Sequence, residues 1–331
     1  MTAPAAATLR PFAPGDEPAV LDLLAASMGW VPDGTTARFF AWKHRESPFG
    51  PSPAWVASEG DRIVAFRAFL RWRFLAGPGG GELRAVRAVD TATHPDHQGR
   101  GLFTRLTRHA LDAVTADGTA FVFNTPNDRS RPGYLKLGWR PAGRPAVLAR
   151  LRSPAVLGRL ARARTPAGKW SEPCDAGVPA AEAAADPALP GLLAAADPGD
   201  GVRTARSPAY LAWRYGFGPL GYRALAAPGG PEEGLVVFRL RRRGPALEAA
   251  VCEELVPGAD ARATGRLLRA VLAATGADYA VRLGGPGRPR AGCVPVPGQG
   301  PTMVRRAAAV ADDALPPPAA WRLGLGDLEL L

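Results

Sequence analysis

The sequence predicts a mixed α/β fold built from two related domains in tandem. Three observations favour this class. Strand-like and helix-like segments alternate along the chain. The chain has 331 residues, which is more than a single hydrophobic core usually organises. A pattern that surrounds Trp42 returns around Trp213, so the second half of the chain resembles the first.

The first half opens with a short strand, a polar turn and an amphipathic helix. All three lie within residues 8–27, and the helix is expected to start near Asp16. After a helical stretch, residues 54–75 are expected to form two antiparallel strands that meet at a turn around Gly60.

The middle of this half is expected to form a strand, a helix and another strand. The strand covers residues 83–93, and the helix covers residues 102–118, where Gly118 can end it in a left-handed conformation. The next strand covers residues 119–124 and precedes a short helix and a last strand. This order predicts one α/β domain over residues 1–150.

An internal repeat sets the other boundaries. The segments "FFAWKHRESPFG" and "YLAWRYGFGPLG" align without a gap at three pairs of residues, each 171 positions apart: Trp42 with Trp213, Pro48 with Pro219 and Gly50 with Gly221. The same order of strands and helix follows both segments, which indicates a duplication. We expect a linker over residues 151–168, a second domain over residues 169–315 and a tail over residues 316–331.

Composition limits the partners and the compartment. The chain has 41 basic and 30 acidic residues, a net charge of +11. The arginines are spread along the chain without an interleaved aromatic signature, so the charge does not indicate nucleic-acid binding. No apolar run reaches the roughly 20 residues that span a bilayer, and the N-terminus does not resemble a signal peptide. We expect a cytoplasmic protein without membrane contact, and the sequence leaves its oligomeric state open.

No metal site is expected. The three cysteines, Cys174, Cys252 and Cys293, are widely spaced and odd in number, which favours neither a disulfide framework nor a metal-binding knuckle. His94 and His97 lie in a glycine loop with no third ligand nearby in the sequence, so a framing role in the turn is favoured over zinc.

The stretch "HPDHQGRGLF", residues 94–103, lies where a strand ends and a helix begins. The first N–H groups of a helix have no partner within it, and the helix dipole favours an anion there. Gly99 and Gly101 lack a Cβ, so a phosphate can approach the main chain, and Arg100 adds a cation. A pair of glycines can also be a simple turn, so the stretch needs support from its context.

Two motifs supply that context, because they resemble those of the GCN5-related N-acetyltransferase (GNAT) superfamily. Gln98 and Gly101 match its acyl-CoA-binding motif, whereas Phe103 stands where glycine or alanine is usual. In "NDRSRPGYLKLGW", five residues fall in register with a later motif of the family: Asn127, Ser130, Tyr134, Leu137 and Gly138. The second half has "VPGADARATGRLL" in place of the glycine loop, so it looks like a degenerate copy.

The resemblance implies two GNAT-like domains, each a mixed, mostly antiparallel twisted sheet flanked by helices. It also implies acetyl-CoA or another acyl-CoA as the cofactor, with the pantetheine arm between the strands at residues 86–93 and 119–124. The residues expected to bind this cofactor are Ala92, Thr93, Gln98, Gly99, Arg100, Gly101, Leu102, Phe103, Thr104, Asn124, Asn127 and Ser130.

The implied reaction is direct transfer of an acyl group to an amine of a small molecule, an aminosugar or a peptide. Phenols and thiols have ordinary pKa values of about 10 and 8.5, so Tyr134 is the candidate proton donor for the departing thiolate. Asp90, on the strand before the loop, is expected to be either the general base or a strand-end hydrogen-bonding residue. Glu82 is a weaker candidate, and many members of the family use water.

Two other functions stay open. One is an acyl-CoA sensor without transfer activity, and the other is a Fem-like transferase that uses aminoacyl-tRNA. The intact glycine loop speaks against the second, because a tRNA donor has no pyrophosphate for it. In the tail, Trp321, Leu323 and Leu325 are expected to anchor the chain. Either Asp327 or the terminal carboxylate then reaches the cleft between the halves, or the tail is a docking segment only.

Overall fold

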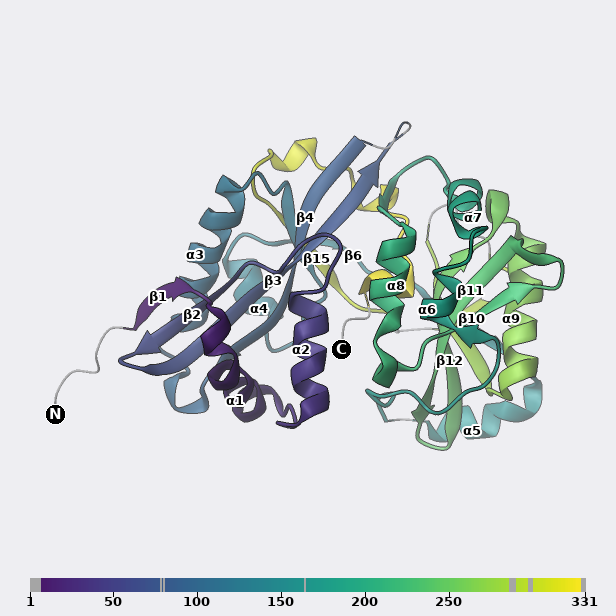
Figure 1. Cartoon of the computed structure of the whole chain (residues 1–331), viewed down its shortest axis with the longest axis horizontal. Helices are drawn as coiled ribbons and strands as arrows, with labels where there is room; N and C mark the ends of the chain where they lie inside the picture. The colour runs from purple at the N-terminus through teal and green to yellow at the C-terminus, as the bar shows by residue number, and fades with distance from the viewer. Residues whose placement is uncertain are drawn as a thin grey trace. The chain divides into compact units, whose positions relative to one another are not determined.

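The structure is a computed structural model, and it describes residues 7–77, 79, 81–163, 165–285, 290–296 and 300–328. The chain forms two compact units, and neither is a continuous stretch of sequence (Figure 1). Unit 1 consists of Met1–Phe74, Glu82–Ala142 and Thr302–Leu315, and unit 2 consists of Leu75–Gly81, Gly143–Pro301 and Pro316–Leu331.

From β1 to β6, unit 1 has the order of elements that the sequence predicts, and one strand from the C-terminal half is added to it. Its elements are β1 (Thr8–Pro11), α1 (Glu17–Met28), α2 (Gly34–His44), β2 (Ala54–Glu59), β3 (Arg62–Ala76), β4 (Gly81–Thr93), α3 (Leu102–Ala116), β5 (Phe121–Asn124), α4 (Arg131–Lys136), β6 (Arg140–Gly143) and β15 (Met303–Ala307). The strands form a mixed sheet in the order β1-β2-β3-β4-β5-β15-β6.

Local sequence explains the best-predicted parts of this unit. The turn at Gly60, where φ is +57°, joins β2 to β3 as antiparallel neighbours. The helix α3 buries Leu106, Ala110 and Val114 at four-residue spacing against the sheet. Gly118 follows this helix with φ at +73°, which confirms its predicted left-handed conformation.

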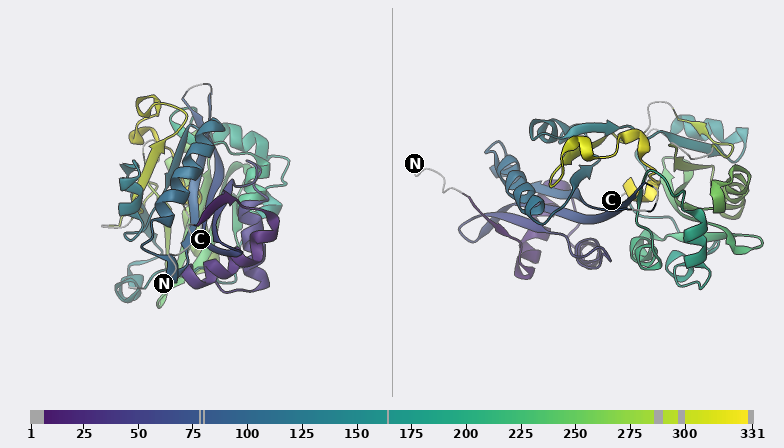
Figure 2. Two further views of the ribbon diagram at one scale, coloured as in Figure 1. Left: turned by 90° about the vertical axis from the view of Figure 1, so that its left-hand side faces the viewer. Right: turned by 90° about the horizontal axis from the view of Figure 1, so that it is seen from above.

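Neighbouring residues of β3 face opposite sides of the sheet. Phe66 packs against Phe40 of α2, with ring centroids 6.0 Å apart. Arg67 reaches Tyr134 of α4 on the other side. Figure 2 shows the purple helices α1 and α2 on one side of this sheet and the blue α3 on the other. The face that carries α3 and α4 is the one on which the glycine loop lies.

Unit 2 contains a second mixed sheet with the strand order β14-β7-β13-β12-β11-β10-β8. Its elements are β7 (Val147–Leu151), α5 (Leu157–Arg162), β8 (Val178–Pro179), α6 (Ala180–Ala183), α7 (Leu189–Ala196), β9 (Val202–Thr204), α8 (Pro208–Gly216), β10 (Arg223–Ala227), β11 (Gly230–Arg243), β12 (Ala246–Leu255), α9 (Ala261–Thr275), β13 (Tyr279–Leu283), β14 (Val294–Pro295) and α10 (Leu325–Leu328).

The two units share one topology. In unit 1, β2, β3 and β4 are followed by α3 and by β5, which pairs with β4 in parallel. In unit 2, β10, β11 and β12 are followed by α9 and by β13, which pairs with β12 in parallel. The recurring tryptophans, Trp42 of α2 and Trp213 of α8, are both buried, as packing residues are. The order of elements predicted for the repeat is therefore present in both units.

Each sheet contains a strand from the other half of the chain. The C-terminal β15 pairs with β5 in unit 1, from Val304 opposite Asn124 to Ala307 opposite Phe121 (yellow in Figure 1). The strand β7, from the N-terminal half of the chain, pairs with β13 in unit 2. The units therefore differ from the continuous ranges 1–150 and 169–315 expected from the sequence, and the expected linker contains the last residue of β7 and the helix α5. A short apolar strand does not specify by its own sequence which sheet edge it joins.

This exchange predicts that residues 1–150 do not fold alone. The fragment would lack β15, so the edge of β5 would expose unpaired backbone groups beside Val122 and Phe123, which are fully buried in the chain. We expect an aggregated fragment without a cooperative thermal transition by circular dichroism. Fragments 1–168 and 169–331, produced together, should instead co-purify through a tag on either one. A soluble, cooperatively folding fragment 1–150 would contradict the exchange.

Candidate active site

The strands β4 and β5 separate at the end that leads to the glycine loop. Their parallel pairing covers Ala85–Phe121, Val86–Val122 and Arg87–Phe123, and no described residue of β5 pairs with β4 beyond Arg87. Asp90, with φ at +44°, interrupts the regular strand in this unpaired segment. The splay expected between these two strands is present.

A cavity of about 390 Å³ lies at the splay, within the size range of small-molecule sites. Its walls come from the ends of α1, β4 and β5, from the loop after β5, and from α3 and α4. The lining residues are Met28, Ala88, Val89, Asp90, Thr91, Thr93, Phe103, Asn124, Thr125, Pro126, Asn127, Arg129, Ser130, Gly133 and Tyr134. Seven of the residues expected at the site from sequence are among them: Asp90, Thr93, Phe103, Asn124, Asn127, Ser130 and Tyr134. Of the others, Ala92 is buried beside Thr93.

The helix α3 begins without a side-chain cap. Its N-cap residue is Gly101, with φ at +72°, and Gly99 has φ at +74°. A Cβ built on either glycine would meet no atom within 4 Å, so the space beside this backbone is open. The first N–H groups of the helix belong to the segment 102–104, which is the segment expected to bind phosphate.

The corresponding helix of unit 2, α9, has a side-chain cap at its N-terminus. Asp260, the N-cap residue of α9, accepts a hydrogen bond from the backbone N–H of Ala263 at 2.5 Å. A carboxylate at this position occupies a free N–H group and repels a phosphate. Of the two equivalent helices, α3 alone begins at an uncapped glycine.

Gln98 and Arg100 attach the glycine loop to neighbouring residues. The Gln98 side chain donates to the Thr93 carbonyl at 3.4 Å. Arg100 donates to Glu59, the last residue of β2, and His97 lies 3.3 Å from the same carboxylate. His97 therefore frames the turn beside Glu59. Among the described residues, no group of three or more His, Cys, Asp or Glu could hold a metal ion.

Tyr134 is a buried residue in the wall of the cavity. Its hydroxyl oxygen accepts a hydrogen bond from Arg67 Nη1 at 2.9 Å. The start of α4 is fixed by Asn127, whose Oδ1 accepts from the backbone N–H of Ser130 at 2.9 Å. Asn127 and Ser130, which we expected to contact the cofactor, are thus bonded to each other at the start of the helix that carries Tyr134.

Asn124 presents an unused acceptor. Its side chain is 4% exposed, and its Oδ1 has no hydrogen-bond partner. A buried carbonyl without a donor is costly, so a ligand N–H group in this cavity would stabilise it. The open backbone at Gly101 and this acceptor are the two features that fit an acyl donor with phosphate and amide groups.

Asp90 is held in a buried ion pair. Lys43 Nζ lies 2.8 Å from its Oδ2, and His44 Nε2 lies 2.9 Å from the same oxygen. Burial raises the pKa of Asp90, but the charge of Lys43 and the hydrogen bond from His44 outweigh it, so the pKa lies well below its ordinary value. Burial lowers the pKa of His44 and outweighs the opposing effect of Asp90. A carboxylate in this state is a weak base.

Unit 2 repeats this arrangement, although it lacks the glycine loop. Tyr215 of α8, the counterpart of His44, donates to Glu253 of β12 at 2.8 Å. In each unit, a residue of the equivalent helix (α2 or α8) therefore holds a buried acid on the equivalent strand (β4 or β12). This favours the second alternative for Asp90, a hydrogen-bonding residue at the strand end. Glu82 lies at the other end of β4, half-exposed and 3.5 Å from Arg73.

Sequence reasoning missed Arg67, Lys43 and His44. A single arginine inside the apolar run "IVAFRAFL" was a usable signal, because a buried cation needs partners. Lys43 and His44 stand beside Trp42 in the repeated segment, but their partner Asp90 lies more than forty positions away.

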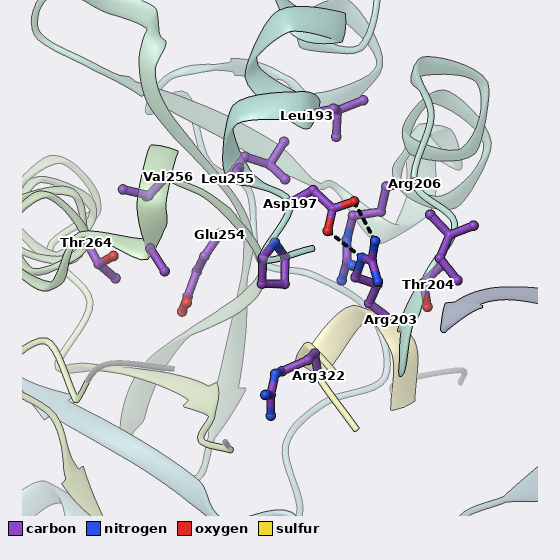
Figure 3. A pocket seen from close by; sticks show the side chains of 14 residues that line it. Leu193, Asp197, Arg203, Thr204, Arg206, Glu254, Leu255, Val256, Thr264 and Arg322 are labelled. Atoms are coloured by element: carbon purple, nitrogen blue, oxygen red, sulfur yellow. Dashed lines mark hydrogen bonds and ion pairs between the residues drawn. The ribbon is translucent and has the colours of Figure 1, made fainter. Parts of the chain in front are cut away.

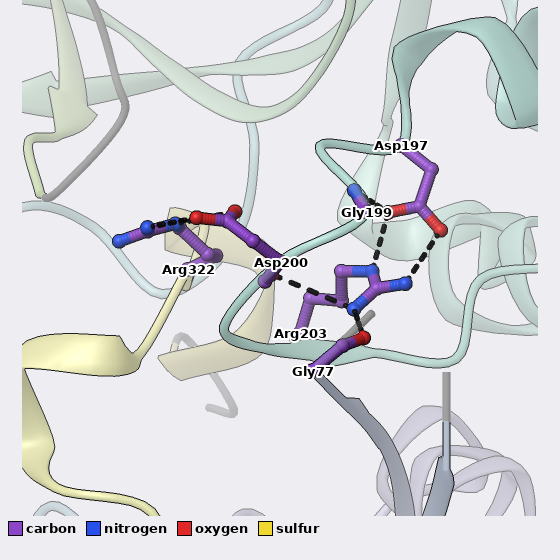
Figure 4. A network of polar contacts seen from close by, with 6 residues as sticks. All are labelled: Gly77, Asp197, Gly199, Asp200, Arg203 and Arg322. Carbon is purple, nitrogen blue, oxygen red and sulfur yellow. Dashed lines mark hydrogen bonds and ion pairs between the residues drawn. The ribbon is translucent and has the colours of Figure 1, made fainter. Parts of the chain in front are cut away.

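One of the cavities of unit 2 has a volume of about 120 Å³, below the usual size of small-molecule sites (Figure 3). Its arginines are engaged within the unit. Arg203 donates to Asp197 at 3.0 Å, and Arg322 donates to Asp200 at 2.6 Å (Figure 4). The Arg322–Asp200 pair fastens the C-terminal segment to the loop before β9, whereas the Arg203–Asp197 pair joins that loop to β9. We assign this cavity no ligand.

The tail is a docking segment as far as the structure describes it. Trp321 and Leu323 are buried, as expected for anchors. Asp327 is fully buried and accepts from Thr204 Oγ1 at 2.7 Å, a contact that fits the docking role of the tail. The terminal carboxylate lies outside the described residues.

A sheet that opens between two parallel strands, beside an uncapped helix, defines the class of GNAT-type acetyltransferase folds. A model of the acetyltransferase (GNAT) domain matches residues 8–142. Residues 8–142 therefore carry the GCN5-related N-acetyltransferase domain that the two sequence motifs indicated.

Solved structures support the same fold over both units. A probable N-acyltransferase from Enterococcus faecalis V583 is 10% identical, covers 92% of this chain and 73% of its own, and has a TM-score of 0.67. A GCN5-related N-acetyltransferase from Kribbella flavida is 19% identical, with coverages of 92% and 72% and a TM-score of 0.60. Eis1 from Mycobacterium abscessus is 16% identical, with coverages of 91% and 73% and a TM-score of 0.56.

No curated protein sequence matches the chain significantly. Among the described residues, no helix is long and apolar enough to cross a membrane.

Proposed function

We propose that the chain transfers an acyl group from acyl-CoA to an amine, most simply an acetyl group from acetyl-CoA. The observation that carries this proposal is the uncapped N-terminus of α3 beside the cavity that contains Tyr134. The acceptor would be an amine of a small molecule, an aminosugar or a peptide.

The donor would bind along the splay. The N–H groups at the start of α3, together with Gln98, Gly99, Arg100 and Gly101, would hold the pyrophosphate, because an uncapped helix start attracts anions. Main-chain groups of Ala92 and Thr93 would bind the pantetheine arm and the acyl carbonyl. Asn124, Asn127 and Ser130 would line the opposite side.

The reaction needs a neutral amine, a stabilised oxyanion and a proton for the leaving sulfur. The amine nitrogen attacks the thioester carbonyl, the carbon–sulfur bond breaks, and Tyr134 donates its proton to the thiolate. We assign the proton of the amine to water rather than to Asp90, because the Lys43 ion pair keeps that carboxylate weakly basic.

Two measurements together decide between transfer and sensing. Free thiol released from acetyl-CoA is followed over a panel of small amines, aminosugars and peptides, and CoA binding is measured by calorimetry. The proposal expects binding together with amine-dependent thiol release. Tight binding without release over the whole panel would favour a sensor. The absence of both binding and release would refute an acyl-CoA site.

We predict that Gly101→Asp weakens CoA binding by about 10-fold or more. Aspartate tolerates the left-handed conformation better than most residues, and its carboxylate would cap α3 as Asp260 caps α9. The phosphate would lose at least one charge-assisted hydrogen bond and gain a like charge. Calorimetric titration with CoA measures the change.

Gly101→Asn is the matched control. It has the same shape and tolerance of positive φ but no charge, so it should lose less affinity than the aspartate variant. Equal affinities of wild type and Gly101→Asp for CoA would place the phosphates elsewhere.

A further inference from the structure

A buried arginine lies under the proposed site. Arg67, in the middle of β3, is 0% exposed. Its Nη1 donates to the Tyr134 hydroxyl at 2.9 Å and also to the Thr91 hydroxyl. Both partners line the cavity, whereas Arg67 is not among the lining residues. The guanidinium therefore lies directly behind the cavity wall.

Aromatic rings surround the guanidinium. Its central carbon lies 4.7 Å from the ring centroid of Phe69, 5.2 Å from that of Tyr134 and 5.7 Å from that of Phe103. Phe103 also packs edge-on against Tyr134, with centroids 5.5 Å apart. This explains why phenylalanine replaces the usual small residue of the motif: its ring covers Arg67 and supports Tyr134.

No acid in the described part of the chain forms an ion pair with Arg67. Among the described residues its hydrogen-bond partners are two neutral hydroxyls, and its Nε and Nη2 have none. A buried cation without a counter-ion is costly, so it is expected where negative charge develops during function. The nearest such place is the oxygen of Tyr134.

Unit 2 has an equivalent residue with another environment. Arg239 follows Phe238 in β11 as Arg67 follows Phe66 in β3, and it is also 0% exposed. It donates to the backbone carbonyl of Lys169 at 3.0 Å. The repeat therefore places a buried arginine in both sheets, and in unit 1 this arginine is hydrogen-bonded to the proposed proton donor.

We propose that Arg67 is a positioning residue that directs the Tyr134 hydroxyl proton toward the donor sulfur and stabilises the phenolate left behind. This inference rests on the proposed function. Because the Tyr134 oxygen accepts from Arg67 Nη1, its own O–H bond points away from the guanidinium.

The proton balance of the step is complete. The amine forms the new carbon–nitrogen bond, and the carbon–sulfur bond breaks with its electron pair on sulfur. The Tyr134 proton moves to sulfur and yields free thiol, while the negative charge on the phenolate is held beside Arg67. Water then returns a proton to the phenolate, and water also takes the surplus proton of the amide nitrogen.

A double-mutant cycle in the full chain tests the link. We expect Arg67→Met to lower kcat by about 10- to 100-fold, the range for one charge-assisted hydrogen bond, with little change in KM for acetyl-CoA. In the Tyr134→Phe background, Arg67→Met should change kcat by less than about 2-fold, since the two residues act as a unit. Arg239→Met is the matched control and should keep kcat. Equal losses from Arg67→Met in both backgrounds, or the same loss from Arg239→Met, would overturn the inference.

A second readout does not depend on turnover. CoA and desulfo-CoA, which lacks the sulfur, are titrated into each variant by calorimetry. Wild type and Arg239→Met should prefer CoA, and Arg67→Met should lose that preference while its affinity for desulfo-CoA stays the same. Arg67→Lys, the milder variant if the methionine protein fails to fold, should keep part of the preference. An unchanged preference in Arg67→Met or Arg67→Lys contradicts the inference, whereas a lost preference in a protein without transfer activity contradicts only the proposed function.

Discussion

Tyr134→Phe is expected to lower kcat by about 100-fold or more and to leave CoA affinity nearly unchanged. The variant removes the hydroxyl of a residue that lines the cavity, where it accepts from Arg67 at 2.9 Å. A general acid contributes mainly to the transition state, so its loss lowers kcat rather than binding. Steady-state thiol release and a calorimetric titration with CoA separate the two effects.

The chain offers a matched control for this variant. Tyr222 is also a buried tyrosine whose hydroxyl lies next to a buried arginine, Arg214, at 3.2 Å, but it belongs to unit 2. Tyr222→Phe should therefore keep kcat. Full turnover by Tyr134→Phe would show that another group protonates the thiolate.

Lys43→Met is expected to destabilise the protein by about 3–5 kcal/mol, the cost of leaving a buried charge without its partner. Lys43 and Asp90 have side chains that are 1% and 5% exposed, so solvent cannot replace the lost cation. Chemical denaturation followed by circular dichroism measures the change. Arg73→Met, which breaks the half-exposed pair with Glu82, should cost less than about 1 kcal/mol. Similar losses in both variants would contradict the buried ion pair.

The same cluster predicts a loss of stability in acid. The pKa of His44 is lowered in the folded protein, so the unfolded chain binds a proton more readily and stability falls below about pH 6.5. The pKa of Asp90 is also lowered, which removes further stability below about pH 4. Lys43→Met should reduce the loss of stability that Asp90 causes in acid, because it removes the main cause of the low pKa of Asp90. An equally steep loss in that variant would mean that other carboxylates dominate.

The parts of unit 1 that local patterns determine could be predicted from the sequence. The apolar spacing of α3 and the left-handed Gly118 are properties of a few neighbouring residues. The loop from Gln98 to Gly101 was recognisable because glycines at a strand-to-helix junction have a physical use.

Features that depend on distant pairing could not be predicted. The strand β15 is five residues long, and nothing in it specifies β5 as its partner. The stretch around Asp90 carries no sign that Lys43 neutralises it. Phe103 looked like a departure from the motif, and its reason lies in Arg67, on another strand. In each case the energy comes from a contact between segments that are far apart in the chain.

The central claim is that unit 1 alone binds the acyl donor, at the start of α3. Hydrogen–deuterium exchange with and without CoA tests it without knowledge of the acceptor. We predict slower exchange at residues 98–104 and 124–134, where the uncapped helix and the cavity lie, and no change at residues 256–264, where Asp260 caps α9. Protection at 256–264 without protection at 98–104 would contradict the account.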